Sequence, residues 1–198
     1  MKWLLSMIAG YLIGSFSTGI VITRFFAHKD IRSVGSGNPG ATNILRVMGK
    51  KYAALTFVLD FLKGMLGAYI GRVLTGGSML GGLLGGFSAV LGHNFPIYFG
   101  FHGGKGISTS FGALIFLFPV QALCGFAVFV LITVLSKYVS AGSISAAVAL
   151  PLFVLLTVPF DLPSRVIVIL FGALAIYRHK PNIIRLLNHS ENKISFRK

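Results

Sequence analysis

The sequence predicts an all-α integral membrane protein with seven transmembrane helices, its N-terminus outside and its C-terminus in the cytoplasm. Of its 198 residues, 55% are hydrophobic and only 11% are charged. The mean hydropathy is +0.83. A soluble domain carries about 25% charged residues, so lipid is expected to be the main solvent of this surface. The length suits one transmembrane domain covering residues 1–198.

Apolar runs mark the expected spans, at residues 3–23, 53–74, 79–98, 107–136, 141–160 and 164–177. A spanning helix needs about 20 apolar residues. The run at 107–136 is too long for one crossing and short for two. Pro119 lies near its middle, where proline favours a break. We therefore consider both one and two crossings for this run.

The 18 Lys and Arg residues, set against 4 Asp and Glu, decide between these alternatives. With two crossings, 14 of the 18 fall on one face, three fall on the other, and Lys63 stays within a span. With one crossing, the split is eight against nine. Because cytoplasmic loops carry the excess of basic residues, the charges favour seven spans and a cytoplasmic C-terminus.

Glycines four residues apart indicate close helix packing. They are Gly77, Gly81 and Gly85, together with Gly82 and Gly86.

A glycine-rich motif occupies the first cytoplasmic loop. It runs from Gly35 to Asn43 and is followed by Arg46. Glycines let backbone N–H groups converge on an anion, and arginine offers a planar fork for phosphate. The motif formally matches the dinucleotide-binding pattern G-x-G-x-x-G, but no strand precedes it, so that interpretation is rejected. The loop is expected to bind a phosphate.

The second cytoplasmic loop carries a similar motif, from Gly92 through Phe101–Thr109. It is not a Walker A loop, because Gly106 stands where Ser or Thr should follow Lys105. It still places that lysine among flexible backbone donors, directly before a helix N-terminus that favours anions. A structural and a functional role for His93 remain equally open.

The third motif follows the last span and runs from Arg178 to Arg185, with Glu191 beyond. His179, Asn182 and Arg185 recur every three residues and can share one helical face. Arg197 and Lys198 at the chain end are expected to bind lipid headgroups.

Two weaker signals lie inside spans. Asp60 and Lys63 are three residues apart and are expected to pair, since isolated charges in a membrane are costly. Ser140 and Ser143 open a span and are either helix caps or substrate contacts. Under the topology chosen from charge, all three loop motifs reach the cytoplasmic face.

In this order and combination, the motifs resemble the bacterial acyl-phosphate-dependent glycerol-3-phosphate acyltransferases, the PlsY family. The resemblance covers nearly the whole chain. It rests on the three loop motifs and on Asp60 with Lys63-Gly64. It implies a seven-helix enzyme of the bacterial cytoplasmic (inner) membrane whose active site faces the cytoplasm. Such an enzyme moves a fatty acyl group from acyl phosphate to the sn-1 hydroxyl of glycerol 3-phosphate, giving lysophosphatidic acid and phosphate.

The resemblance also implies the site residues. The expected catalytic residues are Ser36, Arg46, Lys105, His179 and Asn182. The expected substrate-binding residues are Gly37, Asn38, Gly40, Thr42, Asn43, His93, Gly103, Gly104, Gly106, Ser143, Arg185 and Glu191. The chain departs from the family at His189, where a glycine is common, and at Pro181.

The expected partners are glycerol 3-phosphate, acyl phosphate and membrane lipid, with no nucleic acid and no obligate protein partner. We expect no cofactor and no metal, because four acids, one cysteine and dispersed histidines form no ligand cluster. A small organophosphate transporter is the alternative function. It would be expected to have paired halves and a site at the midplane, and no repeat is detectable.

The H-x-x-x-x-D motif of other glycerolipid acyltransferases is absent. The donor phosphate is therefore the expected proton acceptor, since a phosphate monoester titrates near pH 6. His179 is the rival base.

Overall fold

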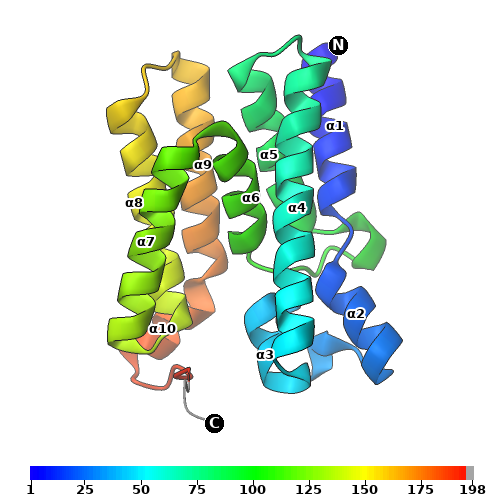
Figure 1. The fold of residues 1–198 in the computed structure, drawn as a ribbon. Coiled ribbons are helices and arrows are strands. Elements are labelled where there is room, and N and C mark those ends of the chain that lie inside the picture. The colour runs from blue at the N-terminus through cyan, green and yellow to red at the C-terminus, as the bar shows by residue number, and fades with distance from the viewer. Residues whose placement is uncertain (195–198) are drawn as a thin grey trace. The chain divides into compact units, whose positions relative to one another are not determined.

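The computed structural model describes residues 1–194, and Arg197 and Lys198 lie outside them. Within this range the chain forms α-helices and two short 3-10 helices and contains no strand, which confirms the all-α prediction. The chain divides into two compact units, Met1–Leu117 and Phe118–Lys198 (Figure 1). The single domain expected over 1–198 stays a prediction.

The first unit is built around the long helix α4. Its helices are α1 (Lys2–Gly14), α2 (Thr18–Ala27), η1 (Ile31–Ser33), α3 (Ala41–Met48), α4 (Lys50–Leu74), α5 (Met79–Asn94), η2 (Ile97–Phe99) and α6 (Ile107–Leu117). Helices α1, α4 and α5 pack on one another, and α6 packs on α4 and α5 (Figure 1).

Glycines bring these helices into backbone contact. A Cβ atom added at Gly10 would overlap the carbonyl of Gly85, and one added at Gly85 would overlap the carbonyl of Gly67. One added at Gly71 would overlap the carbonyl of Gly81, so the packing role predicted for Gly81 and Gly85 is confirmed. It is wrong for Gly77, which lies in the α4–α5 turn with φ +89° and meets nothing within 4 Å.

Replacing Gly85 by Ala is expected to lower the melting temperature far more than replacing Gly77 by Ala. The methyl group at residue 85 must separate α5 from α4, whereas the one at residue 77 meets open space. Gly77→Ala costs only the left-handed backbone strain, about 1–2 kcal/mol. Thermal unfolding in detergent measures both variants. Equal shifts would contradict this account of the packing.

The predicted first span is broken. Helix α1 ends at Gly14 and α2 begins at Thr18. A break leaves backbone carbonyls without intrahelical partners, and inside a membrane these need another donor. Lys63 of α4 supplies one, because its Nζ donates to the carbonyl of Phe16 at 2.8 Å.

The second unit contains α7 (Pro119–Ser136), α8 (Val139–Thr157), α9 (Leu162–Arg178) and α10 (Lys180–Leu187). Helix α8 packs on α7 and α9. Helix α6 ends at Leu117 and α7 begins at Pro119, so the predicted break in the run 107–136 is confirmed. Asp161 caps α9 by accepting a hydrogen bond from the Ser164 N–H at 3.2 Å.

Four helical segments of the described residues are long and apolar enough to cross a membrane. They are Lys2–Ala27, Lys50–Leu74, Pro119–Ser136 and Val139–Thr157. Helices α9 and α10, bent by 55°, make a fifth if they form one span. Large apolar side chains such as Leu135 and Leu156 are more than 70% exposed, as lipid-facing side chains would be. The seven crossings and their orientation stay predictions.

Candidate functional site

The first glycine-rich loop is shaped by two of its own asparagines. The side chain of Asn43 is 2% exposed, and its Oδ1 accepts a hydrogen bond from the Ser36 N–H at 2.8 Å. Its Nδ2 donates to the carbonyl of Val34 at 3.0 Å. Asn38 Oδ1 accepts from the Gly40 N–H at 2.9 Å. Gly37, with φ +70°, turns the chain in the left-handed region.

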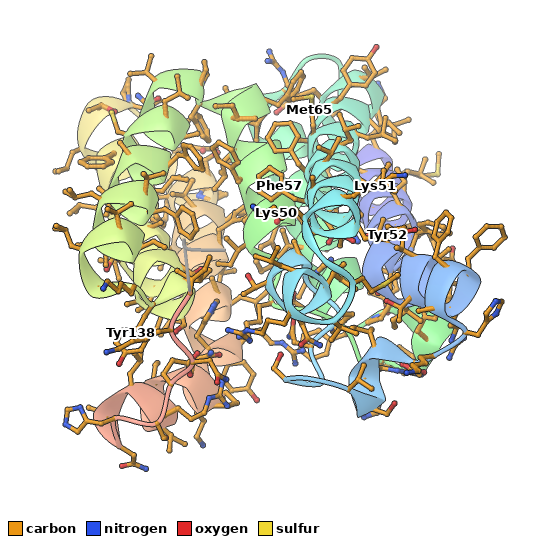
Figure 2. The ribbon with its side chains drawn as sticks, turned by 60° about the horizontal axis from the view of Figure 1, so that its bottom comes forward. Lys50, Lys51, Tyr52, Phe57, Met65 and Tyr138 are labelled. Carbon is orange, nitrogen blue, oxygen red and sulfur yellow. The ribbon has the colours of Figure 1, made fainter. Side chains whose placement is uncertain are left out.

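The remaining polar side chains of this loop face outward. Ser36 and Arg46 are exposed and Thr42 is half-buried. Arg46 lies in the last turn of α3. Lys50 and Lys51 follow on the first turn of α4 (Figure 2). The first unit thus presents a hydroxyl and three basic groups from one short stretch of chain, which is chemistry suited to an anion.

An acid next to this loop escaped the sequence reasoning. Asp30 Oδ1 accepts from Arg32 Nε at 3.0 Å, and its Oδ2 accepts from Arg32 Nη2 at 2.7 Å and from Arg24 Nη2 at 3.0 Å. The hydrogen bonds from Arg32 are the main reason that the pKa of Asp30 lies well below its usual value. Arg32 Nη1 also donates to the carbonyl of Phe99 at 2.9 Å, which ties the first loop to the second.

The second glycine-rich loop folds back on the end of α5. The Gly103 N–H donates to the carbonyl of Asn94 at 3.2 Å, and the Gly104 N–H donates to that of His93 at 3.1 Å. Gly106 has φ +80°. Half-buried Lys105 stands between these glycines, two residues before α6 begins at Ile107. This confirms the predicted placement of the lysine before a helix N-terminus.

Glycine is required at residue 104 for steric reasons. A Cβ atom there would overlap Nε2 of His93, whose side chain is 4% exposed. Asn94, beside it, is fully buried, and its amide nitrogen and oxygen have no hydrogen-bond partner among the described residues. A buried amide in this state needs water or a ligand. Asn94 lies in the predicted second motif, but no role was predicted for it.

The third motif, in the second unit, lies where α9 bends into α10. His179 is the residue between the two helices, and its Nδ1 lies 2.7 Å from the carbonyl of Ala175. A carbonyl only accepts, so Nδ1 carries the proton and Nε2 is the basic nitrogen of the neutral ring. The side chain is 2% exposed.

Glu191 joins two of the predicted residues. Its Oε1 accepts from Asn182 Nδ2 at 2.9 Å, and its Oε2 accepts from Arg185 Nε at 2.7 Å. Burial works to raise the pKa of Glu191, but the hydrogen bonds from Arg185 and Asn182 outweigh it and lower the pKa. The expected shared face is confirmed for Asn182 and Arg185 on α10.

The family model for glycerol-3-phosphate acyltransferases matches residues 4–189 of this chain. The chain belongs to the glycerol-3-phosphate acyltransferase family. A glycerol-3-phosphate acyltransferase of Thermoanaerobacter sp. (strain X514) is 42% identical over 192 residues, which cover 96% of this chain and 94% of that protein. The one of Aquifex aeolicus is 42% identical over 193 residues, covering 98% of this chain and 100% of that protein.

The fold agrees with solved structures of PlsY (YgiH), an integral membrane glycerol 3-phosphate acyltransferase. Its glycerol 3-phosphate form superposes with a TM-score of 0.92 and 41% identity, covering 98% of this chain and 96% of that one. Its lysophosphatidic acid form gives a TM-score of 0.88 and 40% identity, with the same coverage. The predicted family is confirmed, and the chain is an integral membrane protein.

Both departures of this acyltransferase-family chain from the expected third motif have a local explanation. His189 has φ +53°, in the left-handed region where glycine is the usual residue. Pro181 lies in the first turn of α10, where a missing backbone N–H breaks no helical hydrogen bond.

The serines at the start of α8 are not its caps, contrary to one of the two predicted alternatives. The N-cap residue is Tyr138, and no side chain caps the helix. Ser143 is 4% exposed, and its hydroxyl donates to the carbonyl of Val139 at 2.9 Å, within the helix. Ser140 is 6% exposed. A substrate contact is the alternative that stays as a prediction for Ser143.

Replacing Glu191 by Gln is expected to destabilise the α10 region most at neutral pH. Because the pKa of Glu191 is lowered by folding, the carboxylate stabilises the fold above its unfolded pKa. That stabilisation is lost as the pH falls through the folded pKa. Limited proteolysis between pH 7 and pH 3 should therefore show the two proteins converging in acid. A constant difference across this range would contradict the prediction.

Proposed function

We propose that this chain transfers a fatty acyl group from acyl phosphate to the sn-1 hydroxyl of glycerol 3-phosphate, releasing lysophosphatidic acid and inorganic phosphate. Membership of the glycerol-3-phosphate acyltransferase family supports the acceptor. So do the similar solved structures in their glycerol 3-phosphate and lysophosphatidic acid forms. The choice of donor rests on the chemistry of the chain itself.

The observation that carries the proposal is that the four acidic side chains, all of which lie within the described residues 1–194, are already engaged. Asp30 is paired with two arginines and Asp161 caps α9. Asp60 is paired with Lys63, and Glu191 binds Asn182 and Arg185. His179 bonds through Nδ1 to a backbone carbonyl. His93 lies beside Asp60, but its side chain is 4% exposed and the same carboxylate oxygen is also bound by Lys63 and Thr18. The proton acceptor is therefore sought in the substrate.

An acyl phosphate supplies that acceptor. The hydroxyl of glycerol 3-phosphate attacks the acyl carbon, the bond from that carbon to the phosphate oxygen breaks, and the hydroxyl proton passes to the departing phosphate. A phosphate monoester titrates near pH 6, which suits a proton acceptor at neutral pH. A thioester donor has no phosphate attached to its acyl carbon, and its leaving group is a thiolate.

The proposed catalytic residues are those expected from the sequence, but Asn38, Asn43, Arg185 and Glu191, expected to bind substrate, are proposed to position other groups instead. In the first unit, Ser36, Arg46 and Lys105 bind phosphate, with the backbone N–H groups of both glycine loops as further donors. Asn38 and Asn43 hold the first loop in shape for them. In the second unit, His179 and Asn182 contact substrate and Ser143 is a further contact. Arg185 and Glu191 orient Asn182.

The proposed topology has seven crossings, with a cytoplasmic C-terminus and all three motifs on the cytoplasmic face of the bacterial inner membrane. It requires that α5, with 16 residues, and α6, with 11 residues, each cross as short helices. Extensive glycine packing of α5 supports its burial in the bilayer. The acyl donor enters from membrane lipid and glycerol 3-phosphate from the cytosol.

The test is turnover by the purified protein. With acyl phosphate and glycerol 3-phosphate, we expect stoichiometric release of phosphate and lysophosphatidic acid, and no product when acyl-CoA replaces acyl phosphate. Donor chains of several lengths should be tried. Equal rates with acyl-CoA, or no phosphate release with any chain length, would disprove the proposed donor.

A further inference from the structure

A buried acid lies at the centre of the first unit, level with the break between α1 and α2. Asp60 of α4 is 2% exposed, Lys63 of the same helix is 7% exposed, and His93 of α5 is 4% exposed. Charges at this place are unfavourable, because the attraction within a buried ion pair often does not offset the free energy of dehydrating its two charges. Charged side chains within a membrane are therefore rare. The predicted pair of Asp60 and Lys63 forms, with Nζ to Oδ1 at 2.8 Å.

The carboxylate has more partners than a simple pair requires. Thr18, the first residue of α2, donates its hydroxyl to Asp60 Oδ1 at 2.6 Å. His93 Nδ1 lies 3.5 Å from the same oxygen. Lys63 reaches beyond Asp60 to the carbonyl of Phe16 at the helix break. One carboxylate oxygen therefore connects α2, α4 and α5.

Two of these partners lead directly to the glycine-rich loops. Next to Thr18, Gly19 packs so closely on the carbonyl of Pro39 that a Cβ atom would overlap it, and Pro39 belongs to the first loop. The ring of His93 lies against Gly104, and the His93 carbonyl accepts from the Gly104 N–H. Lys105 is the next residue. Asp60 is thus connected to the first loop through Thr18 and to the second loop through His93.

We propose that Asp60 is a positioning residue that, through Thr18 on one side and His93 on the other, holds both glycine-rich loops in the geometry that binds glycerol 3-phosphate. This rests on the proposed function of those loops. A purely structural ion pair could be exchanged for apolar side chains of similar size with little loss. A positioning residue could not, because its contacts with Thr18 and His93 would be lost as well.

The experiment compares Asp60→Leu with the double variant Asp60→Leu/Lys63→Met, because leucine is of similar size and cannot accept the hydrogen bond from Thr18. The single variant leaves Lys63 as a buried, unpaired charge and is expected to be less stable. The double variant removes that charge and should recover most of the melting temperature, with a residual loss from the missing Lys63 hydrogen bond to the Phe16 carbonyl. Its KM for glycerol 3-phosphate should stay raised by about tenfold or more, with kcat less affected, because loops that are held less firmly bind the substrate phosphate more weakly in the ground state and the transition state alike. Asp161→Asn, which removes a carboxylate from a helix cap in the second unit, is the control and should keep the wild-type KM.

Hydrogen exchange provides a readout that does not depend on turnover. In the double variant, backbone N–H groups of residues 35–43 and 103–106 should exchange faster than in the wild type, while those of α7 and α8 should not change. Recovery of both the melting temperature and the KM, or unaltered exchange in both loops, would show that Asp60 and Lys63 are only a structural pair. Absence of turnover in the wild type would instead count against the proposed function, and the exchange data would still decide the role of Asp60.

Discussion

Replacing Gly104 by Ala is expected to reduce the acyl-transfer rate by about 100-fold or more while the protein remains folded. The added methyl group would overlap the His93 ring, which is buried and faces Asp60 and so has little freedom to move aside. The loop must move instead, and Lys105 moves with it. A displacement of about 1 Å in a positioned group can cost about 100-fold in rate.

Gly100→Ala is the matched control for this prediction. Gly100 belongs to the same loop, has φ +66° and meets nothing within 4 Å. Its replacement adds backbone strain of about 1–2 kcal/mol at an exposed turn but does not push on His93. Phosphate release measures the rate of both variants, and thermal unfolding measures whether they fold. A wild-type rate in Gly104→Ala would show that the loop does not need its observed geometry.

Replacing His179 by Ala is expected to lower kcat/KM by roughly 10- to 150-fold, which is the loss of one hydrogen bond to a charged group, about 1.5–3 kcal/mol. If the donor phosphate accepts the proton, the titrating group belongs to the substrate. The shape of the pH profile should then be the same in the wild type and the variant. Initial rates between pH 5 and pH 9 measure both quantities.

The control for His179 is His189→Gly. His189 is exposed, and glycine suits its left-handed backbone, so we expect no loss of rate. The decisive comparison concerns the rising limb of the pH–rate profile, which is the pH range over which the rate increases with pH. If that limb disappears in His179→Ala, then His179 Nε2 is the base, and the proposed role of the donor phosphate is wrong.

The sequence predicted those features that depend on local pattern. Pro119 marks the break between α6 and α7 because proline disrupts a helix wherever it occurs within an apolar run. The glycine spacing in α5 indicated close packing because a helix repeats its faces every three to four residues. Gly77 fits the same spacing but lies beyond the helix end, which spacing alone does not reveal.

Features that depend on contacts between distant residues could not be predicted. The run from residue 3 to residue 23 has a cluster of Gly, Ser and Thr at 14–19, but its overall hydropathy is that of one span, and the contact of Lys63 with Phe16 that accompanies the break is not visible in the sequence. Likewise, the sequence left the role of His93 open, because Asp60 lies 33 positions away and only the packing of α4 against α5 brings them together. The hydrogen bonds of Asn43 to its own loop are of the same kind.

The broken first span has a consequence for how the protein is made. The carbonyl of Phe16 is bound by Lys63, which follows it by 47 residues in the chain. During synthesis the N-terminal segment enters the membrane well before that lysine leaves the ribosome. Until α4 inserts, the segment between α1 and α2 must stay near water or adopt another backbone conformation. The connection between α1 and α2 therefore gains its final hydrogen bonding only after α4 is in place, so a nascent chain that stops short of residue 63 lacks the donor that satisfies the Phe16 carbonyl.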